Sequence, residues 1–233
     1  IQDVPAIVAV ARKHDIVTMI DNTWATPLFF RPLEFGVDIS IHAGTKYVGG
    51  HSDVMLGTVT ANEKTWPEIQ KTWHLLGECV GPDVAWLGQR GLRTLSLRVH
   101  RQMAAGLEVA RWLETRAEIA RVLHPALESH PDHALWKRDF KGSTSLFSIV
   151  LKPGPGEALA AFIDGLELYG IGASWGGYES LALPFDPRAV RTATTWDADG
   201  PAMRLHFGLE DTTDLIADLE AGLERWCKAG GGC

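Results

Sequence analysis

A lysine in a turn of small residues is the first feature of this sequence that could do chemistry. The apolar run 37–41 predicts a buried strand, the small residues 43–45 follow it, and Lys46 precedes a glycine pair at 49–50. Small neighbours leave room for a large group beside the amine, and a desolvated lysine can condense with an aldehyde. We therefore predict that Lys46 holds a cofactor covalently.

Asp21 stands at the end of a second predicted strand, 16–20. In open α/β sheets, ligands bind at the carboxyl ends of the strands, and Lys46 follows another such end. A lysine Schiff base combined with a carboxylate at the ring nitrogen is the arrangement used for pyridoxal phosphate. Without Asp21, the simplest interpretation of Lys46 would be a surface lysine. The combination of Lys46 with Asp21 is what indicates this cofactor.

The pattern of apolar residues indicates how these groups are positioned. Helical spacing predicts a helix over 4–14, and β-branched runs predict strands at 16–20, 37–41 and 54–61, apolar on both faces as in a parallel sheet covered by helices. Apolar residues at steps of four or three then predict one stripe of a long helix: Leu95, Val99, Met103, Leu107, Ala110 and Leu113.

The rest of the chain predicts a second, α+β domain. Helix 156–168 follows a strand at 146–151, strand 203–207 alternates as if half-buried, and a last helix begins near Thr212 or Thr213. We expect residues 230–233 to form a frayed tail. The predicted division is therefore a domain of residues 1–91, with a mainly parallel sheet, followed by residues 92–233.

Composition excludes several classes of protein. The 233 residues are 45% hydrophobic and 22% charged, as in ordinary globular proteins, and the net charge of −7 argues against nucleic-acid binding. No apolar run approaches the roughly 20 residues that span a bilayer. The histidines form no metal-binding pattern, so we expect no metal site. Three cysteines without metal-ligand or disulfide-framework spacing fit a reduced, cytoplasmic protein.

Two further groups of side chains have competing interpretations. The arginines of the long helix region could form an anion site, but a solvated face with ion pairs is the simpler prediction: Arg90, Arg93, Arg98 and Arg101. His42 and His51 flank the lysine, and we expect hydrogen-bonded structural histidines there rather than acid–base groups.

Residues 38–52 resemble the signature of the Cys/Met-metabolism family of pyridoxal-phosphate enzymes, which centres on Thr-Lys-aromatic and Gly-His-Ser. Further segments in the right order match its bacterial cystathionine β-lyase branch: 21–24, 136–143, 174–180 and 204–211. The resemblance covers nearly the whole chain. It implies a fold-type I pyridoxal-phosphate transferase fold, like that of aspartate aminotransferase, here as a partial large domain and a C-terminal α+β domain.

The resemblance also implies roles for individual residues on the cofactor side. Lys46 would bind pyridoxal 5'-phosphate and later act as general base at the substrate Cα. Asp21 would pair with the pyridine nitrogen, and the hydroxyl of Thr45 would bind the phosphate. Ala43 stands where many relatives carry a phosphate-binding serine, which the β-lyases often lack as well.

On the substrate side, Arg204 would bind the α-carboxylate, since a planar guanidinium can do so bidentately. Ser174 and Trp175 resemble the residues flanking that contact. Without the resemblance, Arg204 could instead be a strand residue paired with a nearby carboxylate, and Trp175 a packing residue.

The implied activity is that of a carbon–sulfur β-lyase, which converts L-cystathionine into homocysteine, pyruvate and ammonia. The aromatic residue at Trp175 favours this activity over a γ-lyase or γ-synthase of the same family. The alternative from another class is a non-catalytic fragment. The family also implies a homo-oligomer, a tetramer built as a dimer of dimers.

The sequence opens on Ile1 and enters a helix at once, so we expect a fragment of a longer chain. By the resemblance, the missing part lies before Ile1. It would contain the glycine-containing phosphate loop, the tyrosine that stacks on the cofactor ring and an arm to the neighbouring subunit. We expect little lyase activity from the 233 residues alone.

Overall fold

A computed structural model describes residues 1–233, which form two compact units. The first unit contains Ile1–Val99 together with Asp132–Ser143, and the second contains His100–Pro131 and Thr144–Cys233. The boundary therefore falls eight residues later than the predicted one after Gly91, and a short segment returns to the first unit. The division of function between the two parts stays a prediction.

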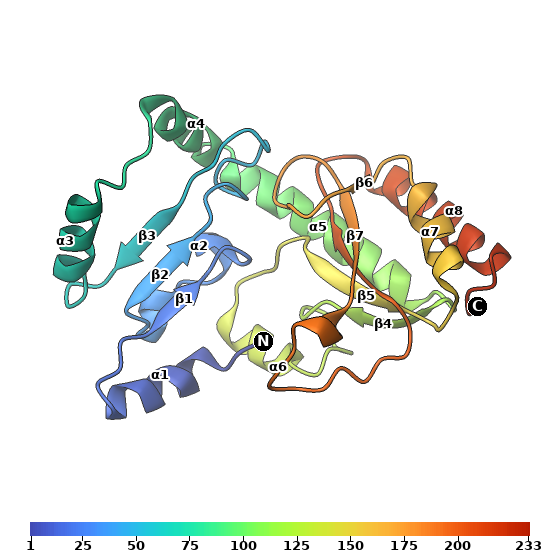
Figure 1. Ribbon diagram of the computed structural model, residues 1–233, viewed down its shortest axis with the longest axis horizontal. Helices are drawn as coiled ribbons and strands as arrows, with labels where there is room; N and C mark the ends of the chain where they lie inside the picture. The colour runs from blue at the N-terminus through green and yellow to red at the C-terminus, as the bar shows by residue number, and fades with distance from the viewer. The chain divides into compact units, whose positions relative to one another are not determined.

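The first unit is built on a three-stranded sheet of order β1-β2-β3 (Figure 1). Strand β1 (Met19–Asp21) runs parallel to β2 (Ile39–His42), as predicted, with Asp21 opposite Ile41. Strand β3 (Thr58–Ala61) is antiparallel to β2. The carboxyl ends of β1 and β2 consequently lie at the same edge of the sheet.

Helix α1 (Val4–Lys13) precedes this sheet, as its spacing predicts, and Asp3 caps it by accepting a hydrogen bond from the Ala6 amide. Two residues after the helix, Asp15 adopts a left-handed backbone conformation with a φ of 51°. The next residue, Ile16, donates its backbone N–H to Ala11 O, so Ile16 is bonded to the last turn of the helix and is not part of β1. Ile16 and Met19 are also about three-fifths exposed, so the predicted burial of both strand faces is wrong for the described residues.

The remaining helical elements of the first unit lie between β1 and β2 or after β3. They are α2 (Thr26–Phe29), η1 (Pro32–Phe35), α3 (Trp66–Leu76), α4 (Pro82–Leu92) and α6 (His133–Asp139). The ring of Phe140, just after α6, stacks on Phe30 with centroids 4.5 Å apart, and Lys141 N donates to Phe29 O. These contacts explain why the segment 132–143 belongs to the first unit.

The second unit contains a five-stranded sheet of order β4-β5-β8-β7-β6, antiparallel except between β6 and β7 (Figure 1). Its strands are β4 (Ile119–Leu123), β5 (Phe147–Leu151), β6 (Gly170–Ile171), β7 (Leu181–Phe185) and β8 (Ala202–His206). Its helices are α5 (Leu95–Glu114), which begins in the first unit, α7 (Gly156–Asp164), η2 (Pro187–Ala189) and α8 (Thr212–Lys228).

One hydrophobic core joins this sheet to α5, α7 and α8. Its members include Leu113, Ile149, Phe162, Leu205, Leu219 and Trp226. The predicted stripe of α5 is confirmed, since Leu95, Val99 and Leu113 are each at most 5% exposed. Helix α7 ends four residues earlier than predicted, at Asp164 before Gly165. Strand β8 is buried on both faces and not half-buried, because a loop covers the face that carries His206.

The C-terminal tail is not frayed, contrary to the sequence-based expectation. Trp226 Nε1 donates to Gly232 O, and Gly232 N donates to Pro153 O, both at 3.0 Å. Cys227 and Cys233 form a disulfide, which corrects the expectation that all cysteines are reduced; Cys79 is free and exposed. None of the helices has the length and apolar character needed to cross a membrane.

Candidate active site

The lysine turn follows directly on the carboxyl end of β2. Lys46 N donates to Ala43 O at 3.0 Å, Gly49 N to Gly44 O at 2.7 Å, and Gly50 N to Lys46 O at 2.8 Å. These bonds fix the backbone on both sides of the lysine, whose side chain is half-buried. The turn therefore presents the amine from a rigid backbone at the sheet edge where ligands bind in open α/β sheets.

Thr45 ties this turn to the segment before β3. Its hydroxyl donates to Leu56 O at 3.2 Å and accepts from Leu56 N at 2.8 Å. A Cβ added at Gly44 would lie 3.0 Å from the Leu56 side chain, so the lysine turn packs closely against Leu56 at this position too. The hydroxyl of Thr45 thus already has a structural task, and its predicted contact with a phosphate stays a prediction.

Asp21 is linked to the lysine turn through Thr23, a residue to which sequence reasoning assigned no role. Asp21 Oδ1 accepts from Thr23 N at 2.9 Å and from Thr23 Oγ1 at 2.5 Å, and the same hydroxyl accepts from Ala43 N at 2.8 Å. Because Ala43 O in turn accepts from Lys46 N, one chain of hydrogen bonds joins Asp21 to the lysine turn. The sequence does contain a sign of this role for Thr23, because in an Asp-x-Thr segment the aspartate side chain typically bonds the backbone two residues on.

The two histidines beside the turn differ in their surroundings. His51 Nδ1 lies 2.8 Å from Gly49 O, which agrees with the predicted hydrogen-bonded role. His42 is 6% exposed, and its Nε2 has no hydrogen-bond partner within the chain. Burial lowers the pKa of His42, and the negative charge of Asp21 acts in the opposite direction. His42 is therefore a buried, neutral neighbour of Asp21 at neutral pH.

Arg98 on α5 holds the residues that follow the lysine. Its guanidinium, 5% exposed, donates to Tyr47 O at 2.9 Å, to Val48 O at 3.4 Å and to Gly91 O at 2.9 Å. A Cβ at Gly50 would lie 1.8 Å from Nη1, and Gly50 has a φ of +69°. The prediction of a solvated arginine face is thus wrong for Arg98, whose charge is buried against backbone carbonyls.

Gly91 brings α4 against the same turn. A Cβ at this position would lie 2.1 Å from Val48 O and 2.6 Å from Gly49 O, so helix and turn touch backbone to backbone. Only glycine permits this approach.

Replacing Arg98 with methionine is expected to destabilise the lysine turn. The change leaves three buried carbonyls without their charged donor, at a cost of about 3 kcal/mol. Denaturant unfolding would measure the loss. Arg90→Met is the matched control, since Arg90 is exposed on α4 with its guanidinium over Trp86. Equal stability of the two variants would contradict the role given to Arg98.

Arg204 lies in the middle of β8, opposite Leu183 of β7. Its Nη2 donates to Ala173 O at 2.8 Å and to Ser174 O at 3.1 Å, and it lies 3.4 Å from Gly172 O. These contacts occupy one nitrogen and leave Nε and Nη1 for a carboxylate. The simpler interpretation required a carboxylate of the chain as the partner of Arg204. The structure instead pairs Arg204 with backbone carbonyls.

Ser174 and Trp175 lie on the loop whose carbonyls Arg204 binds. Ser174 is exposed and Trp175 half-buried. The predicted residues thus fall into two sets: Lys46, Asp21 and Thr45 in the first unit, and Arg204, Ser174 and Trp175 in the second. Within each unit the structure brings its own set together.

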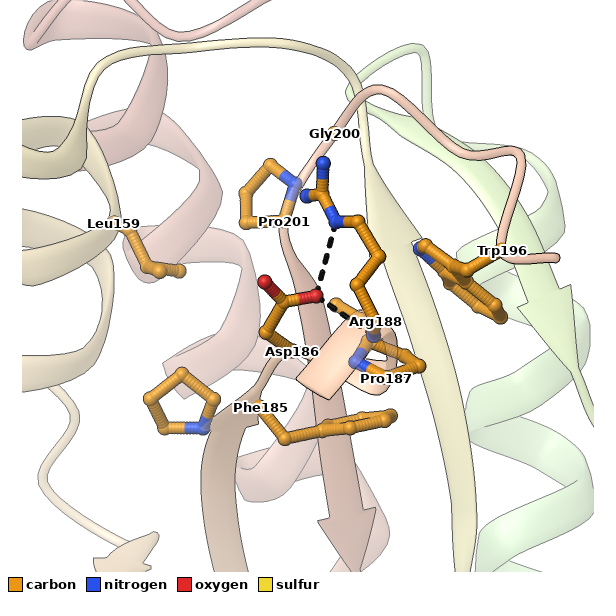
Figure 2. A pocket seen from close by; sticks show the side chains of 10 residues that line it. Leu159, Phe185, Asp186, Pro187, Arg188, Trp196, Gly200 and Pro201 are labelled. Carbon is orange, nitrogen blue, oxygen red and sulfur yellow. Dashed lines mark hydrogen bonds and ion pairs between the residues drawn. The ribbon is translucent and has the colours of Figure 1, made fainter. Parts of the chain in front are cut away.

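A pocket of about 320 Å³ in the second unit lies apart from these residues (Figure 2). Phe185 and Trp196 line it, and the Asp186–Arg188 ion pair, 3.0 Å long, stands at its side. It is next to Ala202, at the opposite end of β8 from His206, and none of the predicted site residues lines it.

The first unit suits a pyridine cofactor with an aldehyde. A half-buried lysine stands on a fixed turn, and a carboxylate held through one oxygen stands at the adjacent strand end with its other oxygen available. Together with the α/β fold, this arrangement defines a fold-type I pyridoxal-phosphate-dependent enzyme. The family model of the Cys/Met metabolism PLP-dependent enzymes matches residues 1–224, and the chain belongs to that family.

Individual relatives agree with this assignment. Cystathionine beta-lyase of Escherichia coli K12 is 47% identical over 231 residues, which cover 97% of the chain and 58% of that protein. An L-alanine/L-glutamate racemase of Wolbachia pipientis is 44% identical over 227 residues, covering 97% of the chain and 56% of the racemase. The chain thus spans little more than half the length of these curated relatives.

A solved structure supports the fold. Cystathionine gamma synthase from Xanthomonas oryzae, in complex with cystathionine, has a TM-score of 0.88 and 34% identity, covering 98% of the chain and 60% of that protein. Because identity exceeds a third over nearly all of the chain, the likeness extends beyond general architecture.

Proposed function

We propose that the protein containing this chain is a pyridoxal-phosphate-dependent carbon–sulfur β-lyase that cleaves L-cystathionine. The observation that carries the proposal is the hydrogen-bonded link between Asp21 and the Lys46 turn at one edge of the sheet. Membership of the family supports the cofactor. The 47% identity to a cystathionine beta-lyase supports the reaction.

Each residue has a defined task in this proposal. When bound, pyridoxal phosphate supplies an aldehyde for the substrate amine and a ring that withdraws electrons from Cα. The Lys46 amine binds that aldehyde in the resting enzyme and later takes the proton from the substrate Cα. Asp21 keeps the ring nitrogen protonated, and Arg204 binds the α-carboxylate through Nε and Nη1.

The products follow from release of the β-thiolate. Cleavage of the Cβ–S bond gives homocysteine, and addition of water to the remaining three-carbon unit gives pyruvate and ammonia. In this proposal Ser174 and Trp175 flank the substrate carboxylate, which is supported by the bonds between Arg204 and the carbonyls of their loop. The role of Trp175 in favouring β- over γ-cleavage is part of the proposal.

Product analysis tests the reaction. Purified holoenzyme supplied with L-cystathionine should release homocysteine and pyruvate in equal amounts. Cysteine in place of homocysteine would instead indicate a γ-lyase, the activity class nearest in the family. Because a 44% identical relative is a racemase, L-alanine should be tested in parallel. Racemisation of alanine without cystathionine cleavage would contradict the lyase proposal.

Asp21→Asn is expected to retain the cofactor and lose most of the activity. An amide cannot stabilise a protonated ring nitrogen, so kcat should fall by roughly 100-fold or more, as for loss of an electrostatic group at a reaction centre. The visible absorbance of the bound cofactor reports its retention. Asp15→Asn is the matched control, since Asp15 is exposed and pairs with Lys64. Full activity of the Asp21 variant would exclude the proposed pairing.

Three predictions about the whole protein accompany this function. They are a homo-oligomer, namely a tetramer built as a dimer of dimers; a cytoplasmic location; and an amino-acid thioether as the substrate, with no nucleic acid or membrane as partner. The alternative of a non-catalytic chain is tested by the same product analysis, since it predicts no pyruvate at all.

A further inference from the structure

The loop that carries Ser174 and Trp175 is held by buried side chains of α5 and β8. Gln102 on α5 is fully buried, and its Nε2 donates to Gly177 O at 2.7 Å. His206 at the end of β8 is 1% exposed, and its Nε2 accepts from Gly176 N at 3.0 Å. The two side chains therefore bind the two neighbouring glycines, His206 at the amide N–H of Gly176 and Gln102 at the carbonyl of Gly177.

The hydrogen bonds of His206 determine which of its ring nitrogens carries the proton. Nε2 lies 3.0 Å from Gly176 N and 3.3 Å from Gly177 O, and the shorter contact, with an N–H that can only donate, assigns the hydrogen to Nδ1, 3.1 Å from Ser145 Oγ. The Ser145 hydroxyl in turn donates to Phe207 O at 2.7 Å. Burial lowers the pKa of His206 to about 4, so Nε2 stays an acceptor at neutral pH.

The two ends of the loop are fixed by charged groups. Arg204 binds the carbonyls of Ala173 and Ser174 at one end. The Glu210 carboxylate accepts from Ser180 N at 2.7 Å and from Ser180 Oγ at 2.8 Å at the other. Between these ends Gly176 has a φ of +84°, a left-handed conformation that glycine adopts without strain. Gln102 and His206 act on this part of the loop.

Core packing alone does not account for a glutamine at position 102. Its Oε1 is buried without a hydrogen-bond partner, which costs free energy that an apolar side chain of similar size would avoid. The amide group that does bond is the one that reaches Gly177 O. The residue type therefore fits the loop contact and not the interior around it.

We propose that Gln102 and His206 are positioning residues for substrate binding. By holding Gly176 and Gly177, they fix Ser174 and Trp175 beside Arg204, and thereby set the affinity for the amino-acid substrate. Both residues lie behind the loop and act through its backbone, so neither is catalytic. This inference rests on the substrate role proposed above for the loop.

Substitutions in the holoenzyme test the proposal. Gln102→Leu and His206→Leu remove the two contacts, whereas His206→Gln keeps an acceptor that can reach Gly176 N. Gln89→Leu, at an exposed position of α4, is the matched control. The readouts are hydrogen exchange of peptides covering 172–180, the visible absorbance of the cofactor, and KM and kcat for cystathionine.

We expect both leucine variants to speed exchange in this loop and to raise KM about tenfold, with cofactor absorbance and kcat little changed. His206→Gln should restore protection and KM toward the values of the unsubstituted enzyme. If His206→Leu fails to fold, Gln102→Leu decides alone. Unchanged exchange in the Gln102 variant, or an unchanged KM, would overturn the proposal. The exchange comparison needs no turnover, so it tests whether the two residues hold the loop even if cystathionine is not cleaved. Absence of cleavage would overturn the proposed function and not the positioning role.

Discussion

Replacing Lys46 with alanine is expected to abolish both the visible absorbance of the bound cofactor and the cleavage of cystathionine. The variant loses the amine that bonds the aldehyde and that takes the proton from Cα. Loss of a general base alone costs roughly 100- to 10,000-fold in kcat. Because the Lys46 backbone bonds to Ala43 and Gly50 are independent of the side chain, the fold should survive the change.

Absorbance spectra of the reconstituted variants, together with pyruvate release, measure this effect. Lys64→Ala is the matched control, since that lysine is two-thirds exposed and forms an ion pair with the exposed Asp15. The control should keep the spectrum and the activity. A Lys46→Ala protein with an intact cofactor spectrum would show that another lysine holds the cofactor.

Replacing Arg204 is expected to weaken substrate binding without releasing the cofactor. In Arg204→Lys a single ammonium group replaces the planar guanidinium that can bind a carboxylate through two nitrogens, and kcat/KM should fall by roughly 100-fold. In Arg204→Met the positive charge is lost as well, and the fall should reach about 1000-fold. The Ala173 and Ser174 carbonyls would also lose their donor in this variant.

Steady-state kinetics with cystathionine separate this effect from general damage. The amine analogue that lacks the α-carboxylate provides a second comparison, because it should bind the Arg204→Met enzyme and the unsubstituted enzyme equally poorly. Arg188→Lys, which keeps its exposed pairing with Asp186, serves as control. If the Arg204 and Arg188 variants behaved alike, the carboxylate role would have to be abandoned.

The sequence predicts those elements in which each face of the helix or strand has one kind of surroundings, either core or solvent. The stripe of α5 follows from side-chain spacing, and Asp3 accepts a backbone hydrogen bond at the start of α1, as Asp211 does at the start of α8. The run 16–20 fails for a physical reason. Its β-branched residues favour a strand, but the backbone of Ile16 is already bonded to the end of α1, and pairing with β2 begins only at Met19.

Burial of polar residues could not be predicted in the same way. Periodicity placed Arg98 on the polar side of its helix but gave no sign that backbone carbonyls would occupy that side. For β8, alternation correctly put Arg204 and His206 on one face, and it could not reveal that the loop 172–178 covers that face. Both errors concern contacts between segments far apart in the sequence.

For the candidate site, the motifs identified the residues with chemistry, and the structure added those that hold them. Lys46, Asp21 and Arg204 stand out by residue type and by resemblance to the family. Thr23 and Gln102 have neutral side chains without a distinctive pattern, and only their hydrogen bonds to Ala43 and Gly177 single them out. Such supporting residues act through geometry, which the order of residues does not specify.

The contact between Gly91 and the lysine turn has a consequence for how this part of the protein can diverge. A single methyl group at position 91 would meet the Val48 carbonyl, so no side chain enters unless the turn moves with it. Because a moved turn would displace the Lys46 amine, selection for activity acts on a helix position that performs no chemistry. Among variants generated at random, position 91 should tolerate as little change as Lys46 itself.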